Sequence, residues 1–220
     1  YFLFTLTPDQ LGRTLFPLGA MDKPAVRARA EALGLVNAKQ PGSQDACLLG
    51  PEESFAEALR QRFSAPATCG EIVDEVGRVV GEHQGLHRFT VGQRRGLGVA
   101  MGRPAFVQRI DPSTARVHIT TRPEDLLAQG LVAGDPTWLV EVPEPGVTFP
   151  CEVQIRYRAT AVPSTAVLRP DGTLAVRFAR AQRAVTPGQA AVLYRAERVL
   201  GGGWIREASR GEASTPFERV

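Results

Sequence analysis

Cys47 is the residue whose type and surroundings best suit covalent chemistry. It follows the polar loop 40–45 and precedes Leu48, close to an expected helix start. A thiol beside the free amides of a helix end can have a lowered pKa, which favours the nucleophilic thiolate. A free cysteine is, however, more often a small buried apolar residue. The local pattern leaves both roles open for Cys47.

The other two cysteines suggest packing. Cys69 precedes an expected strand and Cys151 heads an alternating segment. An odd, sparse set of three cysteines argues against a disulfide framework and for a reducing compartment. There is no Cys-x-x-Cys pair, and no histidine lies near a cysteine in the sequence. We therefore expect no metal site.

The segment 92–98 is the most concentrated basic motif. It places the adjacent Arg94 and Arg95 between glycines, so the backbone can approach a ligand closely while two guanidinium groups are exposed. That combination suits contacts with RNA phosphates. A tight turn with solvated arginines explains the same residues equally well.

A second basic motif, Arg156-Tyr157-Arg158, is expected to end a strand. On an alternating strand the two arginines share one face and Tyr157 points the other way. Basic groups with a stackable ring suit an unpaired nucleotide. A solvated strand end is the competing interpretation.

The bulk composition excludes several classes of protein. The chain has 220 residues, a net charge of +3 and 43% hydrophobic residues, as expected for a folded protein whose mild basic excess suits a polyanion. No apolar run approaches the ~20 residues that cross a bilayer, so a membrane role is not expected. No glycine-rich loop joins a strand to a helix, so no phosphate cradle is predicted.

The periodicity predicts an α+β fold in three parts. Residues 1–65 are expected to be the helical tail of an α/β nucleotide-binding domain, with helices opening at Thr7-Pro8, at Asp22 and at Pro51. This helical part would need preceding chain to bury its apolar faces. Residues 66–128 form a β-rich central domain, 129–206 a closed β-barrel, and 207–220 a loose tail.

The strands expected for the central domain and the barrel are short. In the central domain they cover 71–74, 78–81, 105–110 and 117–120. In the barrel they cover 139–142, 151–157, 161–168, 174–178, 190–194 and a segment after the bend at 201–203.

A series of motifs in a fixed order carries a resemblance to a known family. The motifs are 1–6, 15–19, 43–47, 70–74, 83–87, 90–98, 155–158, 187–189 and 201–205. Together they are similar to the bacterial tRNA-specific 2-thiouridylases, over about residues 1–206. The string at 92–98 and the Ser-Gln-Asp-x-Cys loop ending at Cys47 are specific only in combination.

The resemblance implies a mechanism and a set of sites. Enzymes of this family use ATP to adenylate the C2 oxygen of the tRNA wobble uridine and replace that oxygen with sulfur. The sulfur comes from a sulfur-donor protein and is carried as a persulfide on a cysteine that matches Cys47, assisted by a second cysteine in the N-terminal domain. By motif, the tRNA contacts of the barrel fall on Arg156, Tyr157 and Gln189. Arg94 and Arg95 are expected where RNA passes between domains.

The departures from the family pattern shape the functional expectation. The family's Ser-Gly-Gly-x-Asp-Ser loop does not occur in the sequence, and Leu48 stands where the family usually has Phe. We expect a cytoplasmic fragment, or one subunit of a split enzyme that works with a separate nucleotide-binding subunit, and no ATP bound by this chain. The alternatives are a non-catalytic tRNA-binding module of the same origin and, less favoured, a barrel that binds proteins.

Overall fold

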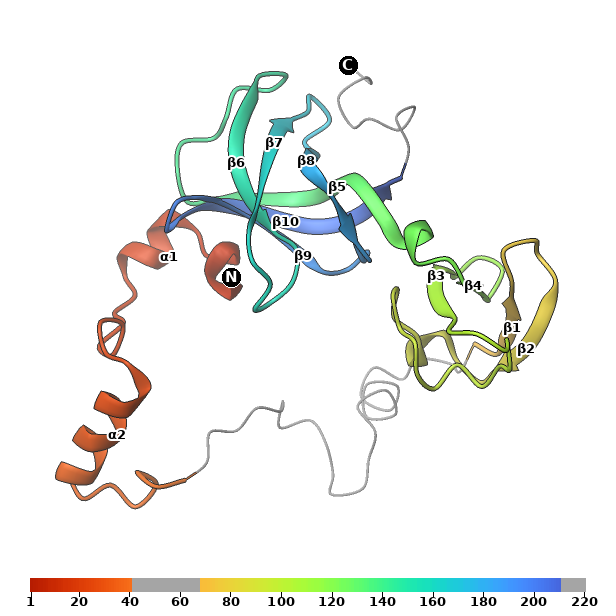
Figure 1. The fold of residues 1–220 in the computed structure, drawn as a ribbon. Coiled ribbons are helices and arrows are strands. Elements are labelled where there is room, and N and C mark those ends of the chain that lie inside the picture. Colours follow the sequence, from red (N-terminus) through yellow and green to blue (C-terminus); the bar gives the residue numbers. More distant parts are fainter. Residues whose placement is uncertain (41–67, 211–220) are drawn as a thin grey trace. The chain divides into compact units, whose positions relative to one another are not determined.

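The computed structural model describes residues 1–40 and 68–210 (Figure 1). In this part of the chain, residues 1–8 and 68–210 belong to one compact unit and residues 9–40 to another. The third helix expected after Pro51, the loop with Cys47 and most of the expected tail lie outside the described residues.

The smaller unit is helical, as predicted. Helix α1 spans Pro8–Gly12 and helix α2 spans Lys23–Ala32. Asp22 is the N-cap of α2, because its carboxylate accepts a 2.8 Å hydrogen bond from the Ala25 amide. The helix ends before Gly34, whose φ of 66° suits a residue without a side chain. Neither helix has a buried residue.

The central domain is a four-stranded sheet with the order β2-β1-β4-β3. Its strands are β1 (Gly70–Val73), β2 (Val79–His83), β3 (Phe106–Asp111) and β4 (Arg116–Thr120), close to the predicted positions. The short 3-10 helix η2 spans Leu86–Arg88. Alternating apolar residues of these strands, with Phe89 and Leu97 from the connections, form a separate core.

The barrel is closed and has six strands in the order β10-β5-β8-β7-β6-β9, which confirms the predicted α+β class with a C-terminal barrel. The strands are β5 (Leu127–Trp138), β6 (Thr148–Gln154), β7 (Val162–Leu168), β8 (Leu174–Arg183), β9 (Ala190–Arg195) and β10 (Arg198–Ser209). The 3-10 helix η3 (Pro123–Leu126) precedes them. The inward side chains make one continuous core.

Several strand bounds of the barrel differ from the expectation: β6 spans 148–154 and not 151–157, and β8 continues five residues beyond 178. Residues 139–142 are not a strand: the Leu139 amide still bonds to Leu200, but Pro143, which has no amide hydrogen, follows at once. The strand is instead β5, ahead of this segment. At the other border β10 continues to Ser209, three residues beyond the expected end.

The first residues of the chain pack on the barrel. The 3-10 helix η1 (Phe2–Thr5) buries Phe4, whose ring lies 5.5 Å from that of Trp204. The Tyr1 hydroxyl donates a 3.0 Å hydrogen bond to the Ala190 carbonyl. A Cβ at Gly202 would lie 2.8 Å from the Phe4 ring, so the glycine makes room for it. Residues 1–8 therefore group with the barrel and not with the helices that follow them.

Candidate nucleic-acid interface

The antiparallel strands place the connections of the barrel alternately at its two ends. The β6–β7 connection (155–161) and the β8–β9 connection (184–189) share one end, which we call the tyrosine end. The connections 139–147, 169–173 and 196–197 share the opposite end, which we call the tryptophan end after Trp138. The predicted tRNA contacts in the barrel all belong to connections of the tyrosine end.

The charges of these connections differ between the two ends. The two connections of the tyrosine end contain Arg156 and Arg158 and no acidic residue. The three connections of the tryptophan end contain one arginine against four acidic residues, which are Glu141, Glu144, Asp171 and Glu197. A polyanion is therefore attracted more strongly to the connections of the tyrosine end.

Arg156 ties the two connections of the tyrosine end together. Its Nη2 donates to the carbonyl of Arg183 and, at 3.3 Å, to the carbonyl of Ala184. The prediction that Arg156 and Arg158 share one strand face is wrong, because β6 ends at Gln154 and 156–158 form a turn. Arg158 has a φ of 64°, the left-handed region that breaks the alternation. These two hydrogen bonds, which we call the Arg156 fork, link the β6–β7 connection to the β8–β9 connection.

Tyr157 is 56% exposed and lies among other aromatic rings. Its centroid is 4.8 Å from that of Phe2 and 6.2 Å from that of Tyr1. The guanidinium carbon of Arg158 lies 5.3 Å from the Tyr157 centroid, within cation–π range. Phe2 was not among the predicted site residues, although the first four residues include three aromatic ones.

The chain under the Tyr157 turn is held by a polar pair. The Tyr194 hydroxyl donates to Gln154 Oε1 at 2.9 Å, and Gln154 Nε2 donates to the Ala159 carbonyl at 2.8 Å. Burial raises the pKa of Tyr194, so its hydroxyl keeps its proton at neutral pH and stays a donor. This pair fixes the position of the turn relative to β6 and β9.

Gln189 carries an unsatisfied acceptor. Its backbone bonds to Thr186 and Ile205, but its side-chain Oε1 is buried and accepts no hydrogen bond from the described residues. A buried acceptor without a donor costs about 1–3 kcal/mol.

Arg94 and Arg95 lie on an exposed loop of the central domain. Gln93 shapes the loop: its Oε1 accepts from the Thr90 amide at 3.0 Å and its Nε2 donates to the Arg95 carbonyl at 2.9 Å. Gly92 has a φ of 87°, and a Cβ there would lie 2.7 Å from that of Ala184. Both arginine side chains are exposed, which suits either phosphate contact or solvation.

The loop also borders a hollow of about 500 Å³ with two arginines. Arg94 and Arg103 line it together with the glycine-rich segment 96–98 and apolar residues of 99–105. The two guanidinium groups suit an anionic group.

The two cysteines that the structure describes differ in exposure. Cys151 is buried, and desolvation raises its pKa to about 12, with a smaller opposing effect from Arg195. It is the packing residue that the sequence predicted, and its thiolate is scarce at neutral pH. Cys69 is exposed, so the prediction that it packs in the interior is wrong; it lies one residue before β1 begins. Cys47 lies outside the described residues.

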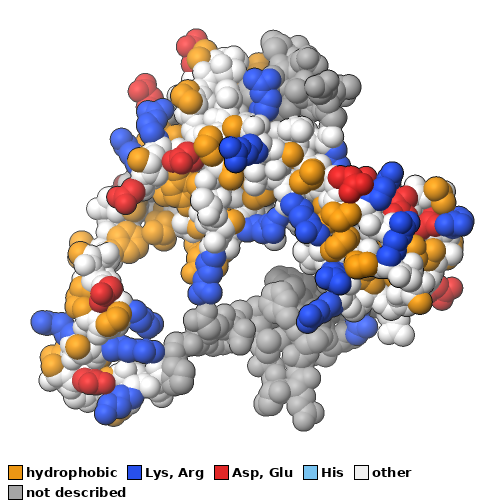
Figure 2. Space-filling model, viewed as in Figure 1, with side chains coloured by type: hydrophobic (Ala, Val, Ile, Leu, Met, Phe, Trp, Pro, Cys, Tyr) orange, Lys and Arg blue, Asp and Glu red, His pale blue; other side chains and the backbone are white. Residues whose placement is uncertain are grey.

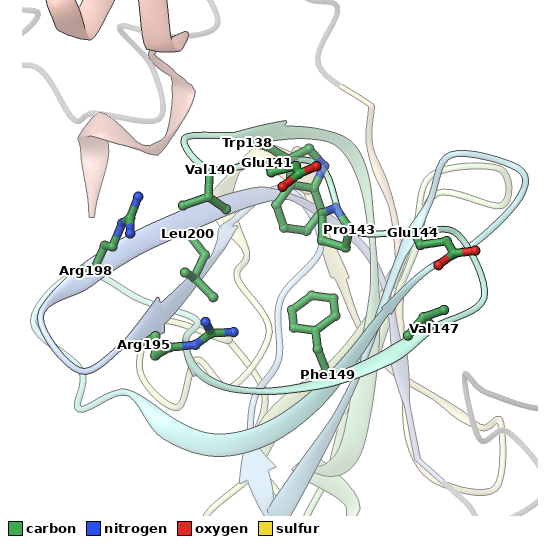
Figure 3. Close-up of a pocket in the computed structure, with 10 residues that line it drawn as sticks. All are labelled: Trp138, Val140, Glu141, Pro143, Glu144, Val147, Phe149, Arg195, Arg198 and Leu200. Carbon is green, nitrogen blue, oxygen red and sulfur yellow. The ribbon is translucent and has the colours of Figure 1, made fainter.

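The tryptophan end has a larger hollow of about 520 Å³. Figure 3 shows Arg195 and Arg198 on the side of the β9–β10 hairpin, and Glu144 on the side of the β5–β6 connection. Between them the walls are apolar, with Trp138, Phe149 and Leu200. None of the predicted site residues lines this hollow.

The surface outside these regions shows mixed charge. Figure 2 shows Lys and Arg side chains interspersed with acidic and hydrophobic ones on the visible face. Within residues 1–40 and 68–210, no group of three His, Cys, Asp or Glu side chains is placed to hold a metal ion. In the same ranges no helix is long and apolar enough to cross a membrane.

Three family models match the chain in consecutive order. Residues 1–51 match the tRNA methyl transferase HUP domain, residues 59–121 the tRNA methyl transferase PRC-barrel domain, and residues 128–205 the aminomethyltransferase beta-barrel domain. The last two coincide with the four-stranded sheet and the six-stranded barrel.

Curated relatives match almost the whole chain. A tRNA-specific 2-thiouridylase MnmA from Geobacter metallireducens is 44% identical over 208 residues, which cover 94% of this chain and 55% of the relative. The proteins of the same name from Solibacter usitatus and Rhodopirellula baltica are 46% and 45% identical, over 93% and 94% of this chain and 57% and 53% of the relatives. The chain belongs to the tRNA-specific 2-thiouridylase family.

The chain matches only part of the length of these relatives. The chain spans a little more than half of the relatives it matches.

Proposed function

We propose that this chain takes part in 2-thiolation of tRNA, as the part that carries the sulfur and binds the RNA. The observation that carries the proposal is the identity of 41–46% to tRNA-specific 2-thiouridylases over more than nine-tenths of the chain. The exposed Tyr157 turn, free of acidic residues, supports the RNA-binding half of it.

The proposed chemistry centres on Cys47. A sulfur-donor protein loads its thiolate as a persulfide, and the outer sulfur attacks C2 of the wobble uridine, whose oxygen has been adenylated by ATP. AMP leaves with that oxygen. A second thiol then attacks the inner sulfur of Cys47, so that the outer sulfur stays on the base and a disulfide is left for reduction.

The proposed RNA contacts come from the described residues. Tyr157 stacks on an unpaired base, and the half-buried side chain of Gln189 contacts a base or sugar at the same end of the barrel. Arg156 holds the turn in place and presents its exposed side to a phosphate. Arg94 and Arg95 contact further phosphates from the central domain.

The activation step needs a nucleotide-binding domain with an ATP site. We propose that this domain acts in cis or as a separate subunit, and that the residues of this chain bind no ATP themselves. The few unpaired cysteines favour a reducing compartment, which is why we place the reaction in the cytoplasm.

The test is a thiolation assay in which a nucleotide-binding region is supplied. The nucleotide-binding region of the Geobacter metallireducens relative is fused ahead of Tyr1, and 2-thiouridine in tRNA is measured by mass spectrometry with ATP and a persulfide donor. We expect product from the fusion and from Cys69→Ser, and a loss of at least a hundredfold in Cys47→Ser. Product that is undiminished in Cys47→Ser would overturn the chemistry. Tight tRNA binding without product would favour the non-catalytic module.

A further inference from the structure

Phe2 and Tyr157 form an exposed pair of rings on the barrel. Their centroids lie 4.8 Å apart with an angle of 41° between the planes. Phe2 is 65% exposed and Tyr157 is 56% exposed, so both rings present most of their surface to water. Two adjoining large rings left exposed are a typical sign of a binding surface.

The Phe2 side of this pair is held rigidly. Phe4 is buried against Gly202 and Trp204, and the Tyr1 hydroxyl bonds to Ala190. Phe2 lies between these two anchors in the chain. Its backbone therefore has little freedom to lose when a ligand stacks on its ring.

The Tyr157 side is held from the opposite direction. Arg156 bonds to the carbonyls of Arg183 and Ala184, and Gln154 bonds to Ala159 beyond the turn. The Arg158 guanidinium lies near the Tyr157 ring. Both rings are thus fixed to the same barrel before any ligand arrives.

We propose that Phe2 is a second stacking residue, which forms with Tyr157 one platform for an unpaired base of the tRNA. The inference rests on the proposed tRNA function and extends it to a residue outside the predicted site. The rings lie 4.8 Å apart, too close for a base to enter between them, so the base stacks on an outer face of the pair. Nearby arginines and the absence of acidic residues from connection 155–161 favour RNA over a basic protein.

The experiment measures binding of a fluorescently labelled anticodon stem–loop RNA by the full chain, using anisotropy over a range of salt concentrations. Phe2→Leu keeps an apolar side chain and removes the ring, so we expect Kd to rise about 5- to 100-fold. Phe2→Tyr keeps a ring and should bind within about twofold of the original chain. Leu3→Ala, at the neighbouring exposed position, is the matched control and should bind normally.

The salt dependence separates stacking from charge. Phe2→Leu should lower affinity at every salt concentration without changing the slope of log K against log salt. The Arg94→Ala/Arg95→Ala double variant should reduce that slope by about 2 if both contact phosphates. A blunt duplex RNA of equal length should bind Phe2→Leu and the original chain alike.

The outcomes discriminate between this inference and the function on which it rests. If the original chain binds the stem–loop and Phe2→Leu binds equally well, the platform is wrong and the proposed function stands. If Phe2→Leu and Leu3→Ala weaken binding together and both melt earlier, the effect is structural and the platform is also wrong. If the original chain binds neither the stem–loop nor whole tRNA, the proposed function fails as well.

Discussion

The two ends of the barrel differ in charge and in the contacts that their arginines make. At the tyrosine end, Arg156 is tied to two backbone carbonyls and Arg158 lies on an aromatic ring. At the tryptophan end, Arg195 and Arg198 lie beside an apolar hollow, and acidic residues occur in every connection. Both ends have arginines and aromatic rings, and the acidic residues of the connections distinguish them.

The comparison shows that the residues around the arginines decide what a surface can bind. Arginines without acidic neighbours, beside exposed rings, suit a single-stranded polyanion. Arginines opposite glutamates around buried rings repel a polyanion from part of the same surface. We therefore assign RNA binding to the tyrosine end. Two predictions examine the difference between the ends, and a third examines a site outside both of them.

Charge reversal should have the largest effect, and at one end only. Arg158→Glu replaces a cation beside Tyr157 by an anion, and we expect tRNA affinity to fall about 10- to 100-fold at low salt. Arg198→Glu makes the same change at the tryptophan end and should change affinity less than about threefold. Titration of labelled tRNA with each variant measures both. Equal losses at the two ends would remove the distinction between them.

Loss of the Arg156 fork should have an intermediate effect, on stability. Arg156→Ala removes two hydrogen bonds from a charged donor to the carbonyls of Arg183 and Ala184, which we expect to cost about 2 kcal/mol of unfolding free energy. Arg195→Ala is the matched change at the tryptophan end and should stay within about 0.5 kcal/mol. Denaturant unfolding of the chain provides both values. If Arg195→Ala lowers the unfolding free energy as much as Arg156→Ala does, the two hydrogen bonds of Arg156 do not stabilise the tyrosine end specifically.

Acid should have the smallest effect and should act outside the barrel ends. Hydrogen bonds from the amide and hydroxyl of Thr121 lower the pKa of Glu75 in the central domain to about 2. A carboxylate with a lowered folded pKa stabilises the fold above its unfolded pKa of about 4.5, and this contribution is lost as the pH falls from about 4.5 to 2.

The matching variant is Glu75→Gln. It should destabilise the central domain by about 1 kcal/mol at pH 7 and lose part of the pH dependence between pH 5 and 2. Thermal unfolding at several pH values measures this. An unchanged pH profile in the variant would show that another carboxylate is responsible.

Much of the fold could be predicted from the sequence where alternation is regular. Strands β3, β4 and β6 follow from apolar residues at alternating positions, and β9 follows from a short apolar run after Pro187-Gly188. Strand β5 was missed because Gly130, Gly134 and Pro136 are residues typical of turns; in the structure Gly134 leaves room for the Arg206 side chain. That requirement comes from the neighbouring strand and is invisible in the local sequence.

The candidate site was predictable in its residue types and not in its geometry. Tyr157 and Gln189 were identified by resemblance, but the turn that exposes Tyr157 depends on a left-handed Arg158. The contact between Phe2 and Tyr157 joins segments at distant positions in the chain, so no local pattern could reveal it. The role of Cys47 stays a prediction.

The measurement that tests the account most directly is ultraviolet crosslinking of the chain to tRNA, with the crosslinked peptides identified by mass spectrometry. We predict that crosslinks concentrate on the peptides that contain Phe2 and Tyr157, and that excess unlabelled tRNA removes them. Crosslinks concentrated instead on Trp138 and the β9–β10 hairpin would place the RNA at the opposite end of the barrel and contradict the account.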